Sequence, residues 1–160
     1  MAQDSTLIDL LSPERLIVTG GDVGKWGLID ELVDCLPLGD GYQGDLELAR
    51  NAVHARENQM TTGLEAGVAL PHGLLPPPVE TRAALAVCPE GLSFDSLDGE
   101  PTHFVLLMVL GDDKAGRDRH LLSLSQAVSL FTGEVGRRTL LEAESTDALW
   151  AALHTLTRGP

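Results

Sequence analysis

Residues 62–73, TGLEAGVALPHG, combine a glycine-rich turn, a short apolar run and a histidine. The run Val68-Ala69-Leu70 is closed by Pro71, which predicts a short strand. His72 follows directly, so we expect it on a tight turn at the exit of that strand. A sheet holds such a side chain in place while the loop exposes it, which is a common arrangement for a reactive group.

The residue types around His72 suit a site that holds an anion. Glycine lets the backbone approach a ligand closely, and hydroxyls and free N–H groups can hold phosphate oxygens. Histidine is the side chain best suited to changing its charge or forming a bond near neutral pH. A glycine hairpin that ends in a histidine is nevertheless more often a turn than a site. The residues alone therefore leave both interpretations open.

Helical and extended patterns alternate on both sides of this stretch. The predicted strands are 16–18, 68–70, 83–88 and 103–110, and the predicted helices are 25–36, 45–57, 118–131, 134–143 and one that begins at 145 or 146. Asp98-Gly99 predicts a hairpin turn, and a loop is expected at 39–41. The helix over 118–131 is expected to bury its spaced apolar residues: Leu121, Leu124, Val128 and Phe131. A sheet covered by helices on both faces buries this order of elements, which predicts the α/β class.

Composition excludes several functional classes. The chain has 160 residues, 43% of them apolar, which predicts one folded domain over 1–160 and argues against disorder. A net charge of −13 argues against binding nucleic acid or an anionic membrane surface. No apolar run approaches the ~20 residues of a membrane span, and the N-terminus lacks the pattern of a signal peptide. We therefore expect a soluble, cytoplasmic protein with no direct membrane insertion.

The other titratable side chains give weaker signals. His54 and His154 are expected to be structural or at the surface, His103 to be a satisfied polar strand end, and His120 to open a helix after the basic residues Lys114, Arg117 and Arg119. A solvated helix start is the simple interpretation of those basic residues. Cys35 and Cys88 fit no disulfide framework or zinc spacing and are expected to be small buried residues.

Residues 62–73 resemble the T-G-I-x-x-G-[IV]-A-[IL]-P-H-[GA] signature of the fructose/mannitol-type IIA proteins of the bacterial phosphotransferase system, EIIA type 2. That family includes the nitrogen-regulatory IIA proteins. Further segments resemble the family in the same order: the R-E pair at 56–57, E-G-I-x-F and D-G-x-P at 90–101, H-L-x-x-L at 120–124 and the last helix from 145. The resemblance implies a three-layer α/β/α sandwich, a mixed β-sheet flanked by helices on both faces.

The resemblance also implies a function for named residues. His72 stands where the family has its phosphorylated histidine, a tele-phosphohistidine, and His120 and Arg56 stand where supporting residues lie. His72 would accept a phosphoryl group from the phosphohistidine of a small carrier protein of the HPr or NPr type. It would then pass the group to the cysteine of a separate IIB component in sugar uptake. No cofactor and no metal is implied, because donor and acceptor are protein side chains.

Other functions remain open at this stage. One alternative is a nitrogen-type regulatory IIA protein whose phosphorylation state controls binding to other proteins, and another is a non-phosphorylated binding module of the same fold. A two-histidine metal site lacks an evident third ligand. The oligomeric state is open, a homodimer included.

Three positions depart from the family pattern. Glu65 replaces a glycine of the turn, and Leu74 and Leu75 follow the P-H-G motif where a basic residue is common. Because both leucines come directly after a histidine that must be reachable, we expect them to form a shallow apolar docking patch with an acidic rim.

Overall fold

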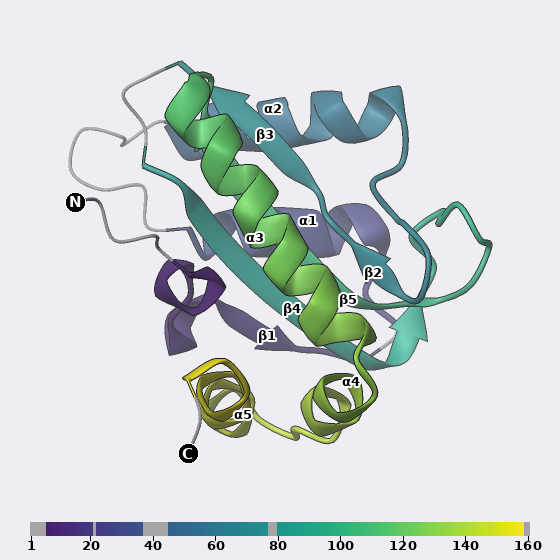
Figure 1. The fold of residues 1–160 in the computed structure, drawn as a ribbon. Helices are drawn as coiled ribbons and strands as arrows, with labels where there is room; N and C mark the ends of the chain where they lie inside the picture. Colours follow the sequence, from purple (N-terminus) through teal and green to yellow (C-terminus); the bar gives the residue numbers. More distant parts are fainter. Residues whose placement is uncertain (1–5, 21, 37–44, 77–79, 159–160) are drawn as a thin grey trace.

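A mixed sheet runs through the middle of the molecule, with helices on both faces (Figure 1). The computed structural model describes residues 6–20, 22–36, 45–76 and 80–158; the loop expected at 39–41 lies outside them. Its strands are β1 (Leu16–Val18), β2 (Val68–Ala69), β3 (His72–Leu75), β4 (Arg82–Leu92) and β5 (Thr102–Gly111). β4 and β5 are antiparallel, and β1, β2 and β3 each run parallel to the strand they pair with.

The central strand β5 is buried on both faces, which is typical of a strand with an unbroken apolar sequence. Val105, Leu107 and Val109 pack under α1 (Lys25–Asp34) and α2 (Asp45–Gln59). The alternate residues pack on the other side, under α3 (Lys114–Thr132), α4 (Glu134–Leu141), α5 (Thr146–Arg158) and the 3-10 turn Leu7–Leu10. The predicted three-layer sandwich is confirmed. None of the described helices is long and apolar enough to span a membrane.

The edge of the sheet beside β5 is one interrupted strand. Val68 of β2 pairs with Phe104, and His72 of β3 pairs with Met108, so β2 and β3 follow one another along the same neighbour. The break falls at Leu70-Pro71, where the N–H of Met108 still donates to the carbonyl of Pro71 at 3.0 Å. The expectation of a turn at His72 was wrong. Proline ends the regular pairing because it has no N–H to donate, yet the chain continues in the same direction as a new strand.

Strand β3 also corrects the expected docking patch. Leu75 is 1% exposed and belongs to the core under α1 and α2, whereas Leu74 is 44% exposed. Successive side chains of a strand point to opposite faces, so two adjacent leucines cannot both line one surface. Gly73 points to the same face as Leu75, and a Cβ there would lie 3.0 Å from Ala52 of α2.

Helix α3 differs from its predicted bounds and face. It begins at Lys114, four residues earlier than expected, because Asp113 caps it by accepting the N–H of Gly116 at 2.8 Å. His120 therefore lies in the second turn and does not open the helix. The face toward the sheet carries small residues and Phe131, whereas Leu121 is 68% exposed. The predicted burial is confirmed for Phe131 and in part for Leu124, but it was wrong for Leu121 and Val128, because small residues let this helix approach the sheet closely.

The remaining elements agree with the sequence patterns, with one extension. The hairpin turn at Asp98-Gly99 joins β4 to β5, and Gly99 has a φ of +73°. Ser145 accepts the N–H of Ala148 at 3.1 Å and so caps α5 as expected. Strand β4 runs on through Pro89 to Leu92, beyond its predicted end at residue 88, with an irregularity after Val87.

Leu75→Ala should lower the free energy of unfolding by about 2–5 kcal/mol, because it leaves a cavity in the core under α2. The neighbouring variant Leu74→Ala is the matched control and should stay within about 0.5 kcal/mol of the wild type, because that side chain is exposed. Urea unfolding followed by circular dichroism measures both. Equal losses in the two variants would contradict the assignment of Leu75 to the core.

Candidate active site

One ring nitrogen of His72 forms a hydrogen bond with the backbone. Its Nδ1 lies 3.0 Å from the carbonyl oxygen of Leu70. A carbonyl can only accept, so this hydrogen bond requires the proton on Nδ1. In the neutral ring Nε2 then carries the lone pair. The half-buried imidazole therefore offers one nucleophilic nitrogen.

Strand register brings His120 against His72. His72 pairs with Met108, whose side chain belongs to the face covered by α3. The two imidazole rings lie 4.7 Å apart between centroids, at 49° to one another. Nε2 of His120 is buried and has no hydrogen-bond partner among the described residues. A buried ring nitrogen without a hydrogen-bond partner is rare in proteins. It is free to form a hydrogen bond with an oxygen of a group that binds at the ring of His72.

The environment keeps His120 uncharged. Burial, followed by the charge of His72, lowers the pKa of His120 from 6.5 to about 4. Burial disfavours the charged ring because it removes water, and a second positive ring nearby adds repulsion. At neutral pH, His120 is thus a neutral imidazole able to donate one N–H.

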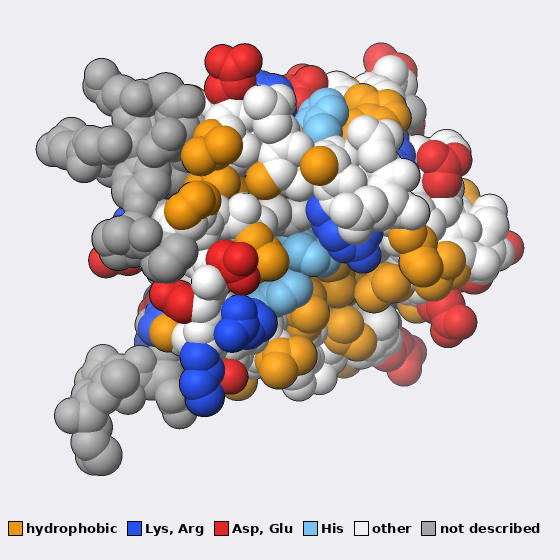
Figure 2. Space-filling model, turned by 90° about the horizontal axis from the view of Figure 1, so that it is seen from above, with side chains coloured by type: hydrophobic (Ala, Val, Ile, Leu, Met, Phe, Trp, Pro, Cys, Tyr) orange, Lys and Arg blue, Asp and Glu red, His pale blue; other side chains and the backbone are white. Residues whose placement is uncertain are grey.

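Arg56 lies in the last turn of α2. Its Nη1 donates to the carbonyl of Met60 at 2.8 Å, and no hydrogen bond joins it to either histidine in the described part of the chain. Met60 is two residues before Thr62, whose carbonyl accepts the N–H of Leu70 at 3.1 Å. Figure 2 shows histidine side chains in the middle of one face, with Lys and Arg side chains nearby on either side.

A buried ion pair beneath the site was not identified from the sequence. The Glu57 carboxylate is fully buried and lies 2.8 Å from Nζ of Lys25, which is 9% exposed. Glu57 also accepts the backbone N–H of Thr62 at 2.9 Å and its hydroxyl at 2.5 Å. The R-E pair was the only local signal for Glu57, and nothing near Lys25 in the sequence indicated its partner.

The turn before the site tolerates the loss of the family's glycine. Glu65 is exposed, and the unusual backbone lies at the next residue, Ala66, with a φ of +60°. A non-glycine residue there costs about 1–2 kcal/mol. Asp98 accepts the N–H of Ala66 at 3.1 Å and Arg137 donates to its carbonyl at 2.5 Å. Side chains from outside the turn therefore hold the conformation.

The other candidates from the sequence lie outside this cluster. His54 contacts Asp30 at 2.7 Å, and Nδ1 of His103 lies 3.0 Å from the carbonyl of Cys88. Lys114 pairs with Asp118 in an exposed helix start. In the described ranges no group of three His, Cys, Asp or Glu side chains could hold a metal ion.

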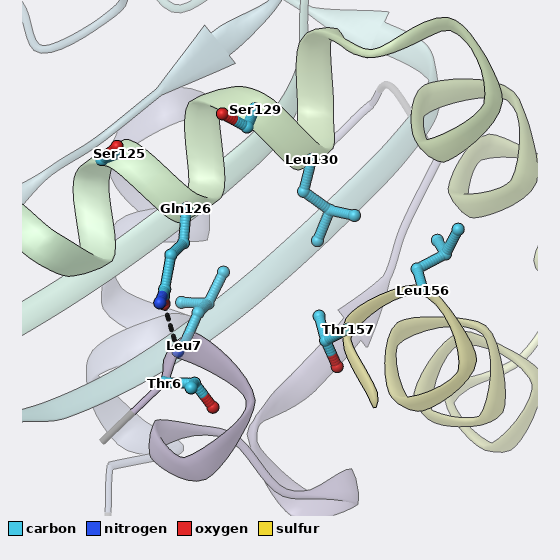
Figure 3. A pocket seen from close by; sticks show the side chains of 8 residues that line it. All are labelled: Thr6, Leu7, Ser125, Gln126, Ser129, Leu130, Leu156 and Thr157. Carbon is cyan, nitrogen blue, oxygen red and sulfur yellow. Dashed lines mark hydrogen bonds between the residues drawn. The ribbon is translucent and has the colours of Figure 1, made fainter. Parts of the chain in front are cut away.

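A separate pocket of about 470 Å³ lies between α3, α5 and the N-terminal turn (Figure 3). Its polar lining consists of hydroxyls and the amide of Gln126, whose Oε1 accepts the N–H of Leu7 at 2.6 Å. Ser129, another lining residue, lies two and a half turns from His120 and hence on the opposite face of α3. This pocket is uncharged and distinct from the histidine site.

Comparison with known proteins relates the whole arrangement to one family model. Residues 28–155 match the model described as phosphoenolpyruvate-dependent sugar phosphotransferase system, EIIA 2. The chain is 34% identical over 143 residues to the fructose-specific EIIABC component of Bacillus subtilis (strain 168). That match covers 89% of this chain and 22% of the relative, so the chain spans about a fifth of that protein's length.

Solved structures share the fold. The nitrogen regulatory protein IIA-Ntr of Neisseria meningitidis superposes with a TM-score of 0.73 at 26% identity, covering 92% of this chain and 98% of that one. The mannitol IIA of Escherichia coli, solved in complex with phosphorylated mannitol IIB, gives a TM-score of 0.67 at 17% identity over 89% of this chain and 96% of that one. At that identity the second likeness concerns the fold alone.

The stability of the protein should depend on the protonation of His120. The pKa of His120 is about 4 in the folded protein and 6.5 in the unfolded chain. Between about pH 4 and pH 6.5, this histidine is therefore protonated in the unfolded chain but neutral in the folded protein. The contribution of neutral His120 to the free energy of unfolding is fully present above about pH 6.5 and is lost as the pH falls toward about 4. In urea unfolding at several pH values, His120→Gln should flatten this part of the profile. His154→Gln, on the exposed face of α5, is the control, and a profile unchanged by His120→Gln would remove His120 as its source.

Proposed function

Because the chain belongs to the EIIA type-2 family of the phosphoenolpyruvate-dependent sugar phosphotransferase system, whose members act in phosphoryl transfer, we propose that Nε2 of His72 is its phosphoryl acceptor. The observation that carries this proposal is the hydrogen bond from Nδ1 of His72 to the Leu70 carbonyl. It leaves Nε2 as the nucleophile beside His120.

The proposed step transfers one phosphoryl group between two imidazoles. The lone pair of His72 Nε2 attacks phosphorus, the new N–P bond forms, and the N–P bond of the donor phosphohistidine breaks. The electron pair of that bond returns to the donor nitrogen. The proton on Nδ1 of His72 stays in its hydrogen bond to Leu70, so no proton has to move. Positioning and charge compensation are the main tasks left to the protein.

His120 and Arg56 have the chemistry to compensate the phosphoryl charge. A neutral His120 can donate an N–H to a phosphoryl oxygen, and the incoming negative charge would favour its protonated form. The guanidinium of Arg56 supplies a permanent positive charge on the adjoining segment. Both are supporting groups, and neither replaces His72 as the acceptor.

A carrier protein needs a surface around the histidines on which to dock. Leu75 lies in the core, but several other apolar side chains are exposed, among them Leu74, Leu97, Leu121 and Val128. A groove of about 410 Å³ lies between α3 and the turn at 64–68, lined by Leu64, Leu97 and Val128 among others. Hydrophobic side chains also surround the histidines on the face drawn in Figure 2. We assign this surface, which includes Leu74 but not Leu75, to transient partners.

In this proposal residues 1–160 act as one EIIA domain in the cytoplasm. The donor is the phosphohistidine of a carrier of the HPr or NPr type, and the acceptor is the cysteine of a IIB component. The fructose-specific EIIABC relative and the mannitol IIA–IIB complex support a IIB acceptor.

Incubation with phosphoenolpyruvate, the general energy-coupling enzyme and its carrier should give one equivalent of acid-labile phosphate on the wild type. His72→Ala should take up none, because the nucleophile is gone. Phosphate on nitrogen is followed by intact-mass measurement before and after acid. A full equivalent on His72→Ala would show that another residue is the acceptor.

His120→Ala separates support from acceptance in the same assay. It should still reach one equivalent but about 10²–10³ times more slowly, the usual cost of losing a positioned donor. His54→Ala is the control, because that histidine pairs with Asp30 on the outer face of α1 and α2.

A nitrogen-type regulatory protein is the second candidate. The likeness to the Neisseria meningitidis IIA-Ntr protein, at 26% identity and a TM-score of 0.73, favours it. In that function the phosphoryl group on His72 would switch binding to other proteins and would not be passed on.

Transfer of the phosphoryl group to an isolated fructose-type IIB domain distinguishes the two candidate functions. If the chain serves sugar uptake, phosphorylated protein should lose its phosphate to that domain within minutes, and a IIB variant with its cysteine changed to serine should receive none. Phosphate that stays on His72, while the two forms of the chain bind different proteins, would favour the regulatory candidate.

A further inference from the structure

An unbroken series of polar contacts joins the buried Lys25–Glu57 ion pair to the ring of His72. We propose that this ion pair is a positioning element that holds the proton of His72 on Nδ1 and so keeps Nε2 free to accept phosphate. The inference deepens the proposed function of His72 and rests on it. It assigns Lys25 and Glu57 a role in the reaction without contact to the phosphoryl group.

The side chains of the ion pair are held in place by several partners. Lys25 comes from the first residue of α1 and Glu57 from the last turns of α2, and both side chains are nearly removed from water. A buried charge needs partners, and the Glu57 carboxylate has three donors: the ammonium of Lys25 and both the N–H and the hydroxyl of Thr62. Lys25 Nζ also lies 3.4 Å from the carbonyl of Phe94. The carboxylate therefore has little freedom to move.

Thr62 connects the ion pair to the backbone at the break between β2 and β3. Two bonds to one carboxylate fix the position of Thr62, which is itself buried. Its carbonyl accepts the N–H of Leu70 at 3.1 Å, and the carbonyl of Leu70 accepts Nδ1–H of His72 at 3.0 Å. Each contact therefore fixes the position of the next backbone segment, and hydrogen bonds shielded from water are stronger than exposed ones.

The strand break explains why the Leu70 carbonyl needs this support. Leu70 lies between β2 and β3 and is outside the pairs that either strand forms with β5. Its orientation is therefore set from the other side, by the bond to Thr62. If Thr62 shifts, the Leu70 carbonyl turns with it, and the hydrogen bond that selects the His72 tautomer weakens. A proton on Nε2 would leave no lone pair for phosphorus.

The test measures the tautomer and the reaction separately. In the unphosphorylated protein, ¹⁵N NMR of the imidazoles should find His72 protonated on Nδ1. In Glu57→Gln and in Lys25→Met, the fraction protonated on Nε2 should rise. The rate of phosphorylation at saturating carrier should fall about 10- to 100-fold, as expected for a misplaced nucleophile, while the KM for the carrier stays constant.

Arg50→Met is the matched control. Arg50 also joins α2 to α1, through Asp30 and Asp34, but within the described residues no hydrogen bond connects it to Thr62 or Leu70. It should leave both the His72 tautomer and the phosphorylation rate unchanged. A comparable change in this variant would mean that any loosening of the two helices acts on His72, and would overturn the specific role of Lys25 and Glu57.

Three further outcomes are decisive. A folded Glu57→Gln protein with wild-type tautomer and rate would overturn the proposal. If that variant does not fold, Thr62→Val, which removes only the hydroxyl bond, should shift the tautomer in the same direction, and no shift would overturn the proposal. If the wild type takes up no phosphate, the proposed function fails, whereas the NMR measurement still decides whether the ion pair sets the tautomer.

Discussion

The pairing of two short strands with one buried central strand is the constraint on which the site depends. β2 and β3 both run parallel to β5, and the interval between them falls at Leu70-Pro71. That interval frees the Leu70 carbonyl for the ring of His72, while the register with Met108 directs the ring toward α3. A shift of one residue would turn His72 to the other face, away from His120, and expose Leu75.

Burial and hydrogen bonding give the two histidines different tasks. His72 has one nitrogen occupied and one available, which suits a nucleophile. His120 has a pKa lowered to about 4 and a buried nitrogen without a partner, which suits a neutral donor. In the function we propose, two rings of the same chemical type thus differ as acceptor and support because their surroundings differ. The site needs few charged groups of its own, in keeping with the modest covalent chemistry of phosphoryl transfer.

Family membership and the departures from the family pattern are compatible. Glu65 stands where the family pattern has a glycine, and the next residue, Ala66, adopts the left-handed conformation. Asp98 and Arg137, which lie outside this turn, hold the backbone of Ala66 by hydrogen bonds. Leu74 and Leu75 have unrelated roles, one exposed and one in the core. The family and the fold are common to relatives named for fructose transport and for nitrogen regulation, so neither one distinguishes the two proposed functions.

Local patterns in the sequence determined the α/β class, most of the helices, the hairpin at Asp98-Gly99 and the motif that contains His72. Turn residues and apolar periodicity act over a few residues, so these features can be recognised without the fold. Only the tertiary structure decided that β3 exists, which face of α3 is buried, and that Lys25 meets Glu57. Each of these depends on contacts between segments far apart in the chain, whose register and close packing no local pattern records.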